Sequence, residues 1–191
     1  MEILIVNSAE PDIREFVIPL ENISKKYGTN YRTIEYNQLQ DTDLNYFHGI
    51  ILSGSPCGDD IVEHHLPFYQ WLIKHEKPVL GICAGHHISG TLWGCELYRG
   101  KEMEIGDYQI FIDHHDELFK GMDSPFVARL MHHDSISLPD EFHLLAHSEK
   151  CGVEAMKHKE NPIYTLQFHP EFLNHQLILN FLNICKNQNF R

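Results

Sequence analysis

The sequence predicts an α/β fold with a mostly parallel central sheet, helices on both faces and a smaller antiparallel β region toward the C-terminus. Four short, largely apolar runs are typical of buried parallel strands and cover residues 2–7, 31–36, 49–53 and 78–82. Helix-like segments at residues 11–27 and 61–75 separate these runs. Alternation of this kind places parallel strands side by side and covers both faces of the sheet with helices.

The rest of the chain supplies shorter strands and a final helix. Strand-like runs with turn residues between them cover residues 109–112, 126–129, 143–148, 151–156 and 164–168. An amphipathic pattern predicts a closing helix over residues 174–186. The 191 residues contain no internal repeat, low-complexity tract or linker, and 42% of them are hydrophobic, enough to bury a sizeable core. The sequence therefore predicts one domain, residues 1–191.

The composition argues against several classes of function. The formal net charge of −12 disfavours nucleic-acid binding, because phosphates require a basic patch. No stretch approaches the roughly 20 consecutive apolar residues of a membrane span, and the N-terminal apolar run is too short for a signal peptide. Five cysteines show neither a disulfide framework nor a Cys-x-x-Cys pair. We therefore expect a cytoplasmic protein with no membrane and no nucleic-acid partner.

The most informative segment is residues 78–87, where an apolar run meets a cysteine near two glycines and continues as a helix. Such a turn lifts one side chain out of the sheet and sets it at the helix N-terminus, where the dipole favours a thiolate. Gly81 and Gly85 leave room for a strained turn, as glycines do around the nucleophilic serine of many hydrolases. Cys83 is therefore a candidate nucleophile. The same residues also fit a buried cysteine at the end of a core strand.

A candidate base and its orienting group follow the last predicted strand. The run over residues 164–168 ends at His169, and Pro170 fixes the turn that leads to Glu171. A cysteine nucleophile needs a base to take its proton, and the base needs a group that holds its ring and tautomer. Cys83, His169 and Glu171 form such a set. The alternative for His169 is a surface histidine at a strand end.

A loop of small residues after the run at 49–53 is a candidate oxyanion site. Gly54, Ser55 and a proline follow that run, and such a loop brings backbone N–H groups close to a reacting carbonyl. The N–H groups of Ser55 and Ala84 would converge on a tetrahedral oxyanion, and loss of one such donor typically costs about a hundredfold in rate or more. Serine suits this loop only without a positive φ. An ordinary strand-to-helix turn fits the same residues.

These three segments, in this order, resemble the class I glutamine amidotransferases, triad-type glutaminase domains that release ammonia for a synthetase. The family has a glycine-rich oxyanion loop, a Gly-Ile-Cys-x-Gly-His-Gln elbow and a Gln-Phe-His-Pro-Glu segment. The last two correspond to residues 81–87 and 167–171. The match covers nearly the full length and is nearest to the amidotransferase subunits of GMP synthetases that are separate chains. It implies a flavodoxin-like α/β fold.

Two positions depart from the family pattern, and both bear on the substrate. His87 stands where the family has a glutamine that helps to hold the substrate. Ser55 follows Gly54 where relatives of the GMP synthetase type have two glycines before the proline. The resemblance implies that Gly54, His87, His132 and Asp134 contribute to the substrate pocket.

Fifteen histidines, several in adjacent pairs, raise the question of a metal site. Neighbouring residues on a strand or helix point in different directions, so a pair rarely binds one ion with both rings, and no His-Glu-x-x-His spacing occurs. We expect no metal and mostly solvated histidines, with His86 as a hydrogen-bonded core residue. Asp59 and Asp60 are expected to cap the helix that begins near residue 61.

The resemblance also implies the reaction, hydrolysis of the glutamine side-chain amide through a Cys83 thioester to give glutamate and ammonia. The chain has no Ser-Gly-Gly-x-Asp-Ser loop and no Walker motif, so an ATP-pyrophosphatase (synthetase) partner would be a separate chain, and no cofactor is expected. Two alternatives stay open. One is a hydrolase of γ-glutamyl peptides or amides with the same triad, which His87 favours, and the other is a non-catalytic binding module.

Overall fold

The computed structural model describes residues 1–56 and 60–187, except for the side chains of residues 60 and 61. The expected helix cap at Asp59 and Asp60 lies outside the described residues. The described residues form a nine-stranded sheet in the order β2-β1-β3-β4-β11-β10-β9-β6-β7. Its first five strands pair in parallel, and they are β2 (Asn30–Glu35), β1 (Glu2–Asn7), β3 (Gly49–Leu52), β4 (Val79–Ile82) and β11 (Ile163–Leu166).

The other four strands of the sheet pair antiparallel. They are β10 (Ala155–His158), β9 (Phe142–Ser148), β6 (Glu104–Ile112) and β7 (Phe126–His132). A separate two-stranded sheet joins β5 (Leu97–Tyr98) to β8 (Ser135–Ile136). The predicted fold class is confirmed, and the larger part of the antiparallel region continues the central sheet rather than forming a sheet of its own.

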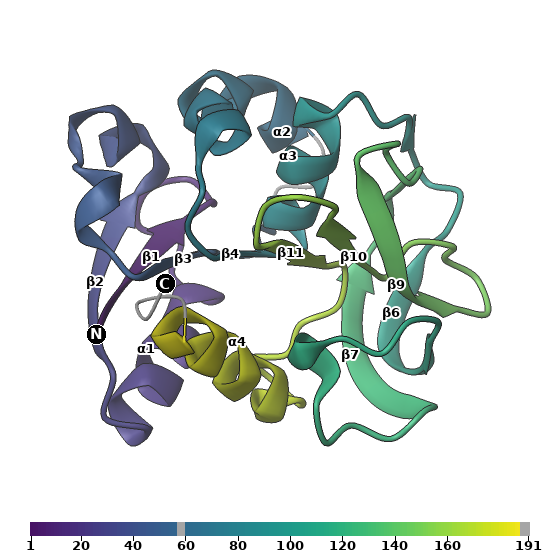
Figure 1. Ribbon diagram of the computed structural model, residues 1–191. Coiled ribbons are helices and arrows are strands. Elements are labelled where there is room, and N and C mark those ends of the chain that lie inside the picture. The colour runs from purple at the N-terminus through teal and green to yellow at the C-terminus, as the bar shows by residue number, and fades with distance from the viewer. Residues whose placement is uncertain (57–59, 188–191) are drawn as a thin grey trace.

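Helices cover both faces of the sheet (Figure 1). One face carries α1 (Val17–Lys26) and α4 (His175–Asn187), and the other carries α2 (Asp60–His65) and α3 (Ala84–Leu92). Short 3₁₀ segments complete the connections, namely η1 (Tyr36–Asp41), η2 (Leu44–Tyr46), η3 (Leu66–Lys74) and η4 (Glu117–Phe119). Within the part of the chain that the structure describes, no helix is both long and apolar enough to span a membrane.

The two helical layers bury two apolar cores. Strand β1 supplies both, because Ile3 and Ile5 pack into the core beneath α1 and α4, whereas Leu4 and Val6 pack into the core beneath α2 and α3. All four side chains are fully buried. Each contributes about 1.5–3 kcal/mol by leaving water.

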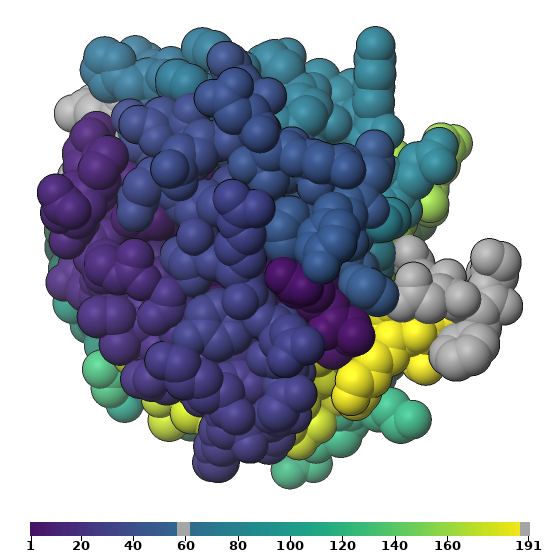
Figure 2. Space-filling view, turned by 90° about the vertical axis from the view of Figure 1, so that its left-hand side faces the viewer, coloured from purple at the N-terminus to yellow at the C-terminus, as the bar shows by residue number. Residues whose placement is uncertain are grey.

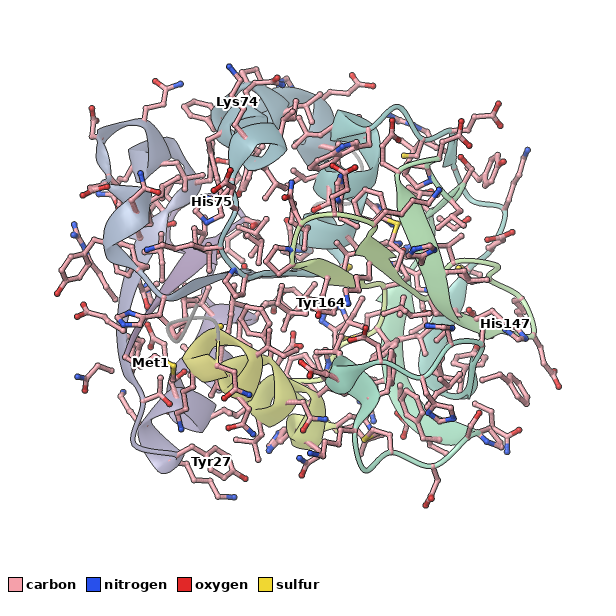
Figure 3. The ribbon with its side chains drawn as sticks, in the orientation of Figure 1. Met1, Tyr27, Lys74, His75, His147 and Tyr164 are labelled. Carbon is pink, nitrogen blue, oxygen red and sulfur yellow. The ribbon has the colours of Figure 1, made fainter. Side chains whose placement is uncertain are left out.

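Two views locate the halves of the molecule. In Figure 2, residues of the N-terminal part form most of the visible face, with the C-terminal helix α4 at its lower right. Figure 3 places Tyr164 of β11 near the centre, His147 of β9 toward one side, and Met1 and Tyr27 toward the other. The parallel and antiparallel halves therefore meet at the centre of the molecule, where β11 lies.

Three predicted ranges differ from the observed elements for local reasons. The first helix begins only at Val17, after a loop in which Asp12 has a φ of 74°. The second changes from α to 3₁₀ geometry at Leu66, next to Pro67, which has no N–H to continue the α-helical pattern. The strand predicted from residue 151 begins at Ala155, because the Ser148 N–H instead donates to the Cys151 carbonyl and closes a turn.

Candidate active site

The turn between β4 and α3 has an unusual backbone conformation. Cys83 follows the last residue of β4 and has φ 50° and ψ −98°, a combination that L residues rarely adopt. Its N–H donates to the Leu166 carbonyl at 2.8 Å, which extends the pairing of β4 with β11 by one residue. The sharp turn places the Cys83 side chain at the N-terminus of α3, where the helix dipole stabilises negative charge.

Glycines on either side of Cys83 allow α3 to pack closely against the sheet. A Cβ at Gly81 would lie 2.6 Å from the Gly85 carbonyl oxygen, and a Cβ at Gly85 would lie 2.9 Å from atoms of Leu52. Neither distance is compatible with a side chain unless the backbone moves. Both glycines are therefore required by close packing, as the sequence predicted.

His169 and Glu171 form a buried pair beside this turn. His169 Nδ1 and Glu171 Oε1 are 2.8 Å apart, and both side chains are completely buried. Because the carboxylate accepts the hydrogen bond, Nδ1 carries a proton, which leaves Nε2 as the titrating nitrogen. Phe16 stacks on the imidazole with ring centroids 4.8 Å apart and further restricts its orientation.

The Cys83 thiol and the His169 imidazole shift each other's pKa. Burial raises the pKa of Cys83, but His169 and, to a smaller extent, His87 lower it, and the net shift is downward. Burial lowers the pKa of His169, but Glu171 and Cys83 raise it to about 10. Both shifts favour a thiolate beside an imidazolium, the reactive form of a cysteine nucleophile.

The loop after β3 lies next to the Cys83 turn. β3 and β4 are adjacent and parallel, so the ends of both strands lie at the same edge of the sheet. The Ser53 hydroxyl fixes the loop, because it accepts from the Ser8 N–H and donates to the Gly54 carbonyl, each at 3.0 Å. Ser55 is not among the residues with positive φ, so serine is compatible with this loop.

A cavity of about 280 Å³ opens over these groups. It brings together most of the site residues that the sequence suggested. It is lined by Glu15, Phe16, Ser55, Pro56, Cys83, Ala84, His87, Met131, His132, His133 and Asp134. Gly54 is not part of this lining. It lies against His169 instead, where a Cβ would come within 2.8 Å of the ring.

The oxyanion candidates differ in position. Ala84 is the first residue of α3, so its N–H has no partner within the helix. Ser55 is buried and comes from the neighbouring loop. Both line the cavity with Cys83, so the structure brings the two candidate donors and the nucleophile to one wall.

Gln167 is a site residue that the sequence analysis quoted only as part of a motif. Its side chain is fully buried between Cys83 and His87. Its amide oxygen lies 2.5 Å from His87 Nε2, and its amide nitrogen lies 3.9 Å from Cys83 Sγ. Gln167 therefore links the residue that departs from the family pattern to the nucleophile. Only its place two residues before His169, at the end of a strand beside β4, could have suggested this.

The antiparallel half supplies the opposite wall of the cavity. His132 ends β7, and its Nδ1 lies 3.0 Å from the Asp134 carbonyl oxygen. Burial lowers the pKa of His132 to about 4, so its ring is neutral near pH 7. The Asp134 carboxylate accepts from the Gly100 N–H at 2.7 Å, which fixes the turn that carries both residues.

The histidines are more buried than the sequence suggested. His86 is fully buried with Nδ1 2.7 Å from the Thr165 hydroxyl, which confirms the prediction for this residue. Seven of the fifteen histidines are buried, namely His65, His75, His86, His87, His132, His158 and His169. In two of the adjacent pairs one ring is buried and the other exposed, because neighbouring side chains point to opposite sides.

Comparison with known proteins places this fold and site in a family. The sequence model described as glutamine amidotransferase class-I matches residues 16–183. A glutamine-hydrolysing subunit of GMP synthase from Methanocaldococcus jannaschii is 37% identical over 142 residues, which cover 72% of this chain and 73% of the relative. The subunit of the same name from Methanothermobacter thermautotrophicus is 34% identical over 188 residues, which cover 90% and 99% of the two chains.

Solved structures agree with this assignment. The crystal structure of a putative GMP synthase subunit from Thermoplasma acidophilum is similar with a TM-score of 0.87 and 27% identity, covering 99% of this chain and 96% of that one. A glutamine amidotransferase from Thermotoga maritima shares the fold, with a TM-score of 0.75 and 20% identity over 98% and 83% of the two chains. The strained Cys83 turn, the buried His169–Glu171 pair and these similarities lead to one conclusion: the chain belongs to the class I glutamine amidotransferase family.

Proposed function

We propose that this chain hydrolyses the side-chain amide of glutamine to glutamate and ammonia, and that a separate synthetase subunit consumes the ammonia. The observation that carries the proposal is the Cys83–His169 pair, in which the thiol pKa is lowered and the imidazole pKa is raised. The names of the relatives support the chemistry, because they are glutamine-hydrolysing subunits of GMP synthases.

The first half-reaction forms a thioester. The Cys83 thiolate attacks the amide carbon, and the N–H groups of Ser55 and Ala84 stabilise the oxyanion of the tetrahedral intermediate. His169 donates its Nε2 proton to the departing nitrogen, so ammonia leaves and the acyl group stays on sulfur. Glu171 keeps the His169 ring in the orientation and tautomer that this transfer needs.

The second half-reaction releases glutamate. His169, now neutral at Nε2, takes a proton from a water molecule as the oxygen attacks the thioester carbon. The same two N–H groups stabilise the second oxyanion. Collapse of this intermediate breaks the carbon–sulfur bond and restores the Cys83 thiolate beside the imidazolium.

The cavity residues of the two halves of the sheet would hold the substrate. We assign substrate contacts to His87, His132 and Asp134, which line the cavity. Gly54 would act indirectly, because it leaves room for the His169 ring. Hydrolysis of γ-glutamyl peptides or amides is a second candidate function, because His87 replaces the usual glutamine and lies against Gln167 beside the nucleophile.

The synthetase partner would be a separate ATP-pyrophosphatase subunit of the GMP synthetase type. The relatives are named as single subunits of GMP synthases, which supports an enzyme assembled from more than one chain. We further propose that residues 1–191 act as one domain, because the continuous sheet crosses both halves. A cytoplasmic location would keep the Cys83 thiol reduced.

The test is glutamate release from glutamine by wild type and Cys83→Ala, with and without the candidate ATP-pyrophosphatase subunit. We expect Cys83→Ala to lose at least about 10³-fold in turnover while keeping its circular dichroism spectrum. Cys95→Ser, which removes a thiol outside the cavity, serves as the matched control and should retain activity. Turnover retained in Cys83→Ala would refute the mechanism.

A second arm separates the two substrates. The wild type and His87→Gln are assayed with glutamine and with a γ-glutamyl dipeptide. An amidotransferase subunit should prefer glutamine and respond to the partner, and His87→Gln should preserve or improve that preference. Faster cleavage of the dipeptide by the wild type, with no response to the partner, would favour the hydrolase instead.

A further inference from the structure

Behind the His132 wall of the cavity lies a buried cluster of four side chains with metal-ligating atoms. Glu104 begins β6, His132 ends β7, and Cys151 and Glu154 lie in the connection between β9 and β10. Each of the four offers one ligand atom, and these atoms all lie within 4.8 Å of one another. All four residues are at least 96% buried. Nothing in the sequence pattern indicated this cluster, because its members are spread over 51 positions from 104 to 154.

The tautomer of His132 directs a lone pair into the cluster. Its Nδ1 lies 3.0 Å from the Asp134 carbonyl oxygen, which can only accept, so Nδ1 must donate. Nε2 of the neutral ring is then unprotonated, and it makes no hydrogen bond with any residue that the structure describes. It faces Glu104 Oε2 at 3.6 Å and Glu154 Oε1 at 3.9 Å. A lone pair opposite two carboxyl groups is unfavourable unless a cation or proton lies between them.

Glu154 presents the same need. Its side chain is fully buried, and neither carboxyl oxygen has a hydrogen-bond partner among the described residues. The ion-pair distances found for Glu104 and Glu154 in the described parts of the chain lead only to His132. Two buried carboxyl groups beside a neutral imidazole therefore have no protein cation to balance them.

We propose that Glu104, His132, Cys151 and Glu154 bind one divalent transition-metal ion of the zinc type. Zinc accepts nitrogen, sulfur and carboxylate oxygen as ligands, and four of them complete its tetrahedral coordination. Bonds of about 2.0–2.3 Å hold tetrahedral ligand atoms roughly 3.3–3.8 Å apart, close to the two His132–glutamate distances. Small side-chain rotations would bring the wider pairs to the same spacing.

A second layer of hydrogen bonds already orients the ligands. The Ser148 hydroxyl lies 3.0 and 2.8 Å from the two oxygens of Glu104 and accepts from the Cys151 N–H at 2.9 Å. The Asp134 carbonyl plays the equivalent role for His132, and a backbone carbonyl on the second nitrogen is a common feature of metal-binding histidines.

The charges and protons of binding balance. Burial, and next Glu154, raise the pKa of the Cys151 thiol, so the metal must displace its proton, which leaves to solvent as the sulfur–metal bond forms. Any proton held by Glu154 leaves in the same way. The ion's two positive charges then offset the carboxylates, and no oxidation or reduction is required.

The site has a structural role toward the cavity. The ion would join the β6 and β7 ends, which are paired at Glu104 and His132, to the turn that carries Cys151 and Glu154. His132 is both a ligand and part of the cavity lining, so metal binding would fix its ring in the wall opposite Cys83. No step of amide hydrolysis uses the ion.

The test uses protein purified without a polyhistidine tag or immobilised metal. The full chain carrying Cys83→Ala is used beside the wild type, so that the catalytic thiol does not bind the probe. Metal content is measured by inductively coupled plasma mass spectrometry, and the metal-free protein is titrated with Zn²⁺ and Co²⁺. We expect one ion per chain, a cobalt–thiolate absorption band in the near ultraviolet, and a higher Tm with Zn²⁺.

Two variants and one control locate the ion. In the Cys83→Ala background, Cys151→Ser should abolish the cobalt–thiolate band, and Glu154→Gln should weaken Zn²⁺ binding about 100-fold or more. His133→Gln, which changes the exposed neighbour of His132, should change neither. A Cys83→Ala chain that shows no band, no Zn²⁺ binding and no rise in Tm would overturn the proposal, and would assign the space to a proton shared by the carboxyl groups. A band that survives Cys151→Ser would overturn it as well.

Discussion

The two halves of the nine-stranded sheet bury their side chains in different ways. In the parallel half, every residue of β3, β4 and β11 is buried, because helices cover both faces. In the antiparallel half, β7 alternates buried and more exposed residues, and β6 has exposed residues along its length. The parallel half is thus a two-sided apolar layer, whereas the antiparallel half has one face close to solvent.

This difference corresponds to a division of chemical roles. The candidate nucleophile and its base follow β4 and β11, at the ends of parallel strands that are held by their neighbours on both sides. The antiparallel half contributes His132 and Asp134, which line the cavity without contacting the reacting sulfur in our mechanism. A rigid layer fixes the reacting groups, and a half-exposed layer shapes the pocket in front of them.

The largest effect should come from replacing the base in the parallel half. His169→Gln should lower glutamine hydrolysis by about 10²–10⁴-fold, because proton transfer to the leaving nitrogen is lost. It should also raise the pKa of the Cys83 thiol, because His169 is the main group that opposes the effect of burial. Hydrolysis assays give the first quantity, and the pH dependence of Cys83 alkylation by iodoacetamide gives the second.

The matched control is a histidine of the antiparallel half. His143→Gln changes an exposed ring on β9 and should leave both the hydrolysis rate and the alkylation profile unchanged. An unchanged thiol pKa in His169→Gln would show that the two side chains do not form an ion pair, and would remove the main support for the proposed function.

The next effect concerns the tolerance of each half to one added methyl group. Gly85→Ala should destabilise the protein by about 1–2 kcal/mol, since the new Cβ would meet Leu52 at 2.9 Å and this overpacking outweighs the gain in helix propensity. Gly152→Ala, in the antiparallel half, adds a Cβ with no atom within 4 Å and should change stability by less than about 0.5 kcal/mol. Urea denaturation measures both. Equal costs would show that the parallel half is not the more tightly packed.

The smallest effect is the response of a buried histidine in the parallel half to acid. Burial, and next Lys77, lower the pKa of His75 to about 4. An unfolded histidine titrates near 6.5, so between about pH 6.5 and 4 the unfolded chain binds a proton that the folded chain does not. This difference lowers stability as the pH falls through that window.

His75→Gln should therefore lose less stability than wild type between pH 7 and pH 5. His64→Gln, at an exposed position nearby, should follow the wild type. Urea denaturation of the three proteins at both pH values measures the differences. A His75→Gln profile identical to the wild type would mean that His75 is protonated in the folded state at pH 5.

The sequence predicted the parallel half better than the antiparallel half, and the burial patterns explain why. Strands buried on both faces read as continuous apolar runs, so β1, β3 and β4 were predicted to within one residue at either end. β6 begins at Glu104 rather than at residue 109, because its exposed residues and Gly106 interrupt the apolar pattern. Motifs tied to short-range geometry, such as the Cys83 turn, are visible in one segment of sequence.

Contacts between distant segments were not visible. Gln167 reaches His87 and Cys83 across the boundary between β4 and β11, and nothing in its immediate neighbours shows this. The cluster of Glu104, His132, Cys151 and Glu154 depends on the register of the antiparallel strands and on the turn after β9. Neither register nor turn could be derived from hydrophobic pattern, because a slip of one residue would move each side chain to the other face.

The backbone conformation of Cys83 has a consequence for how mutations at this position would be selected. A non-glycine residue with φ 50° and ψ −98° costs about 1–3 kcal/mol, which Cys83→Gly would largely relieve. Variants chosen for folding alone would therefore drift toward glycine, whereas variants chosen for ammonia release would keep cysteine. At this residue the most stable sequence and the most active sequence are different proteins.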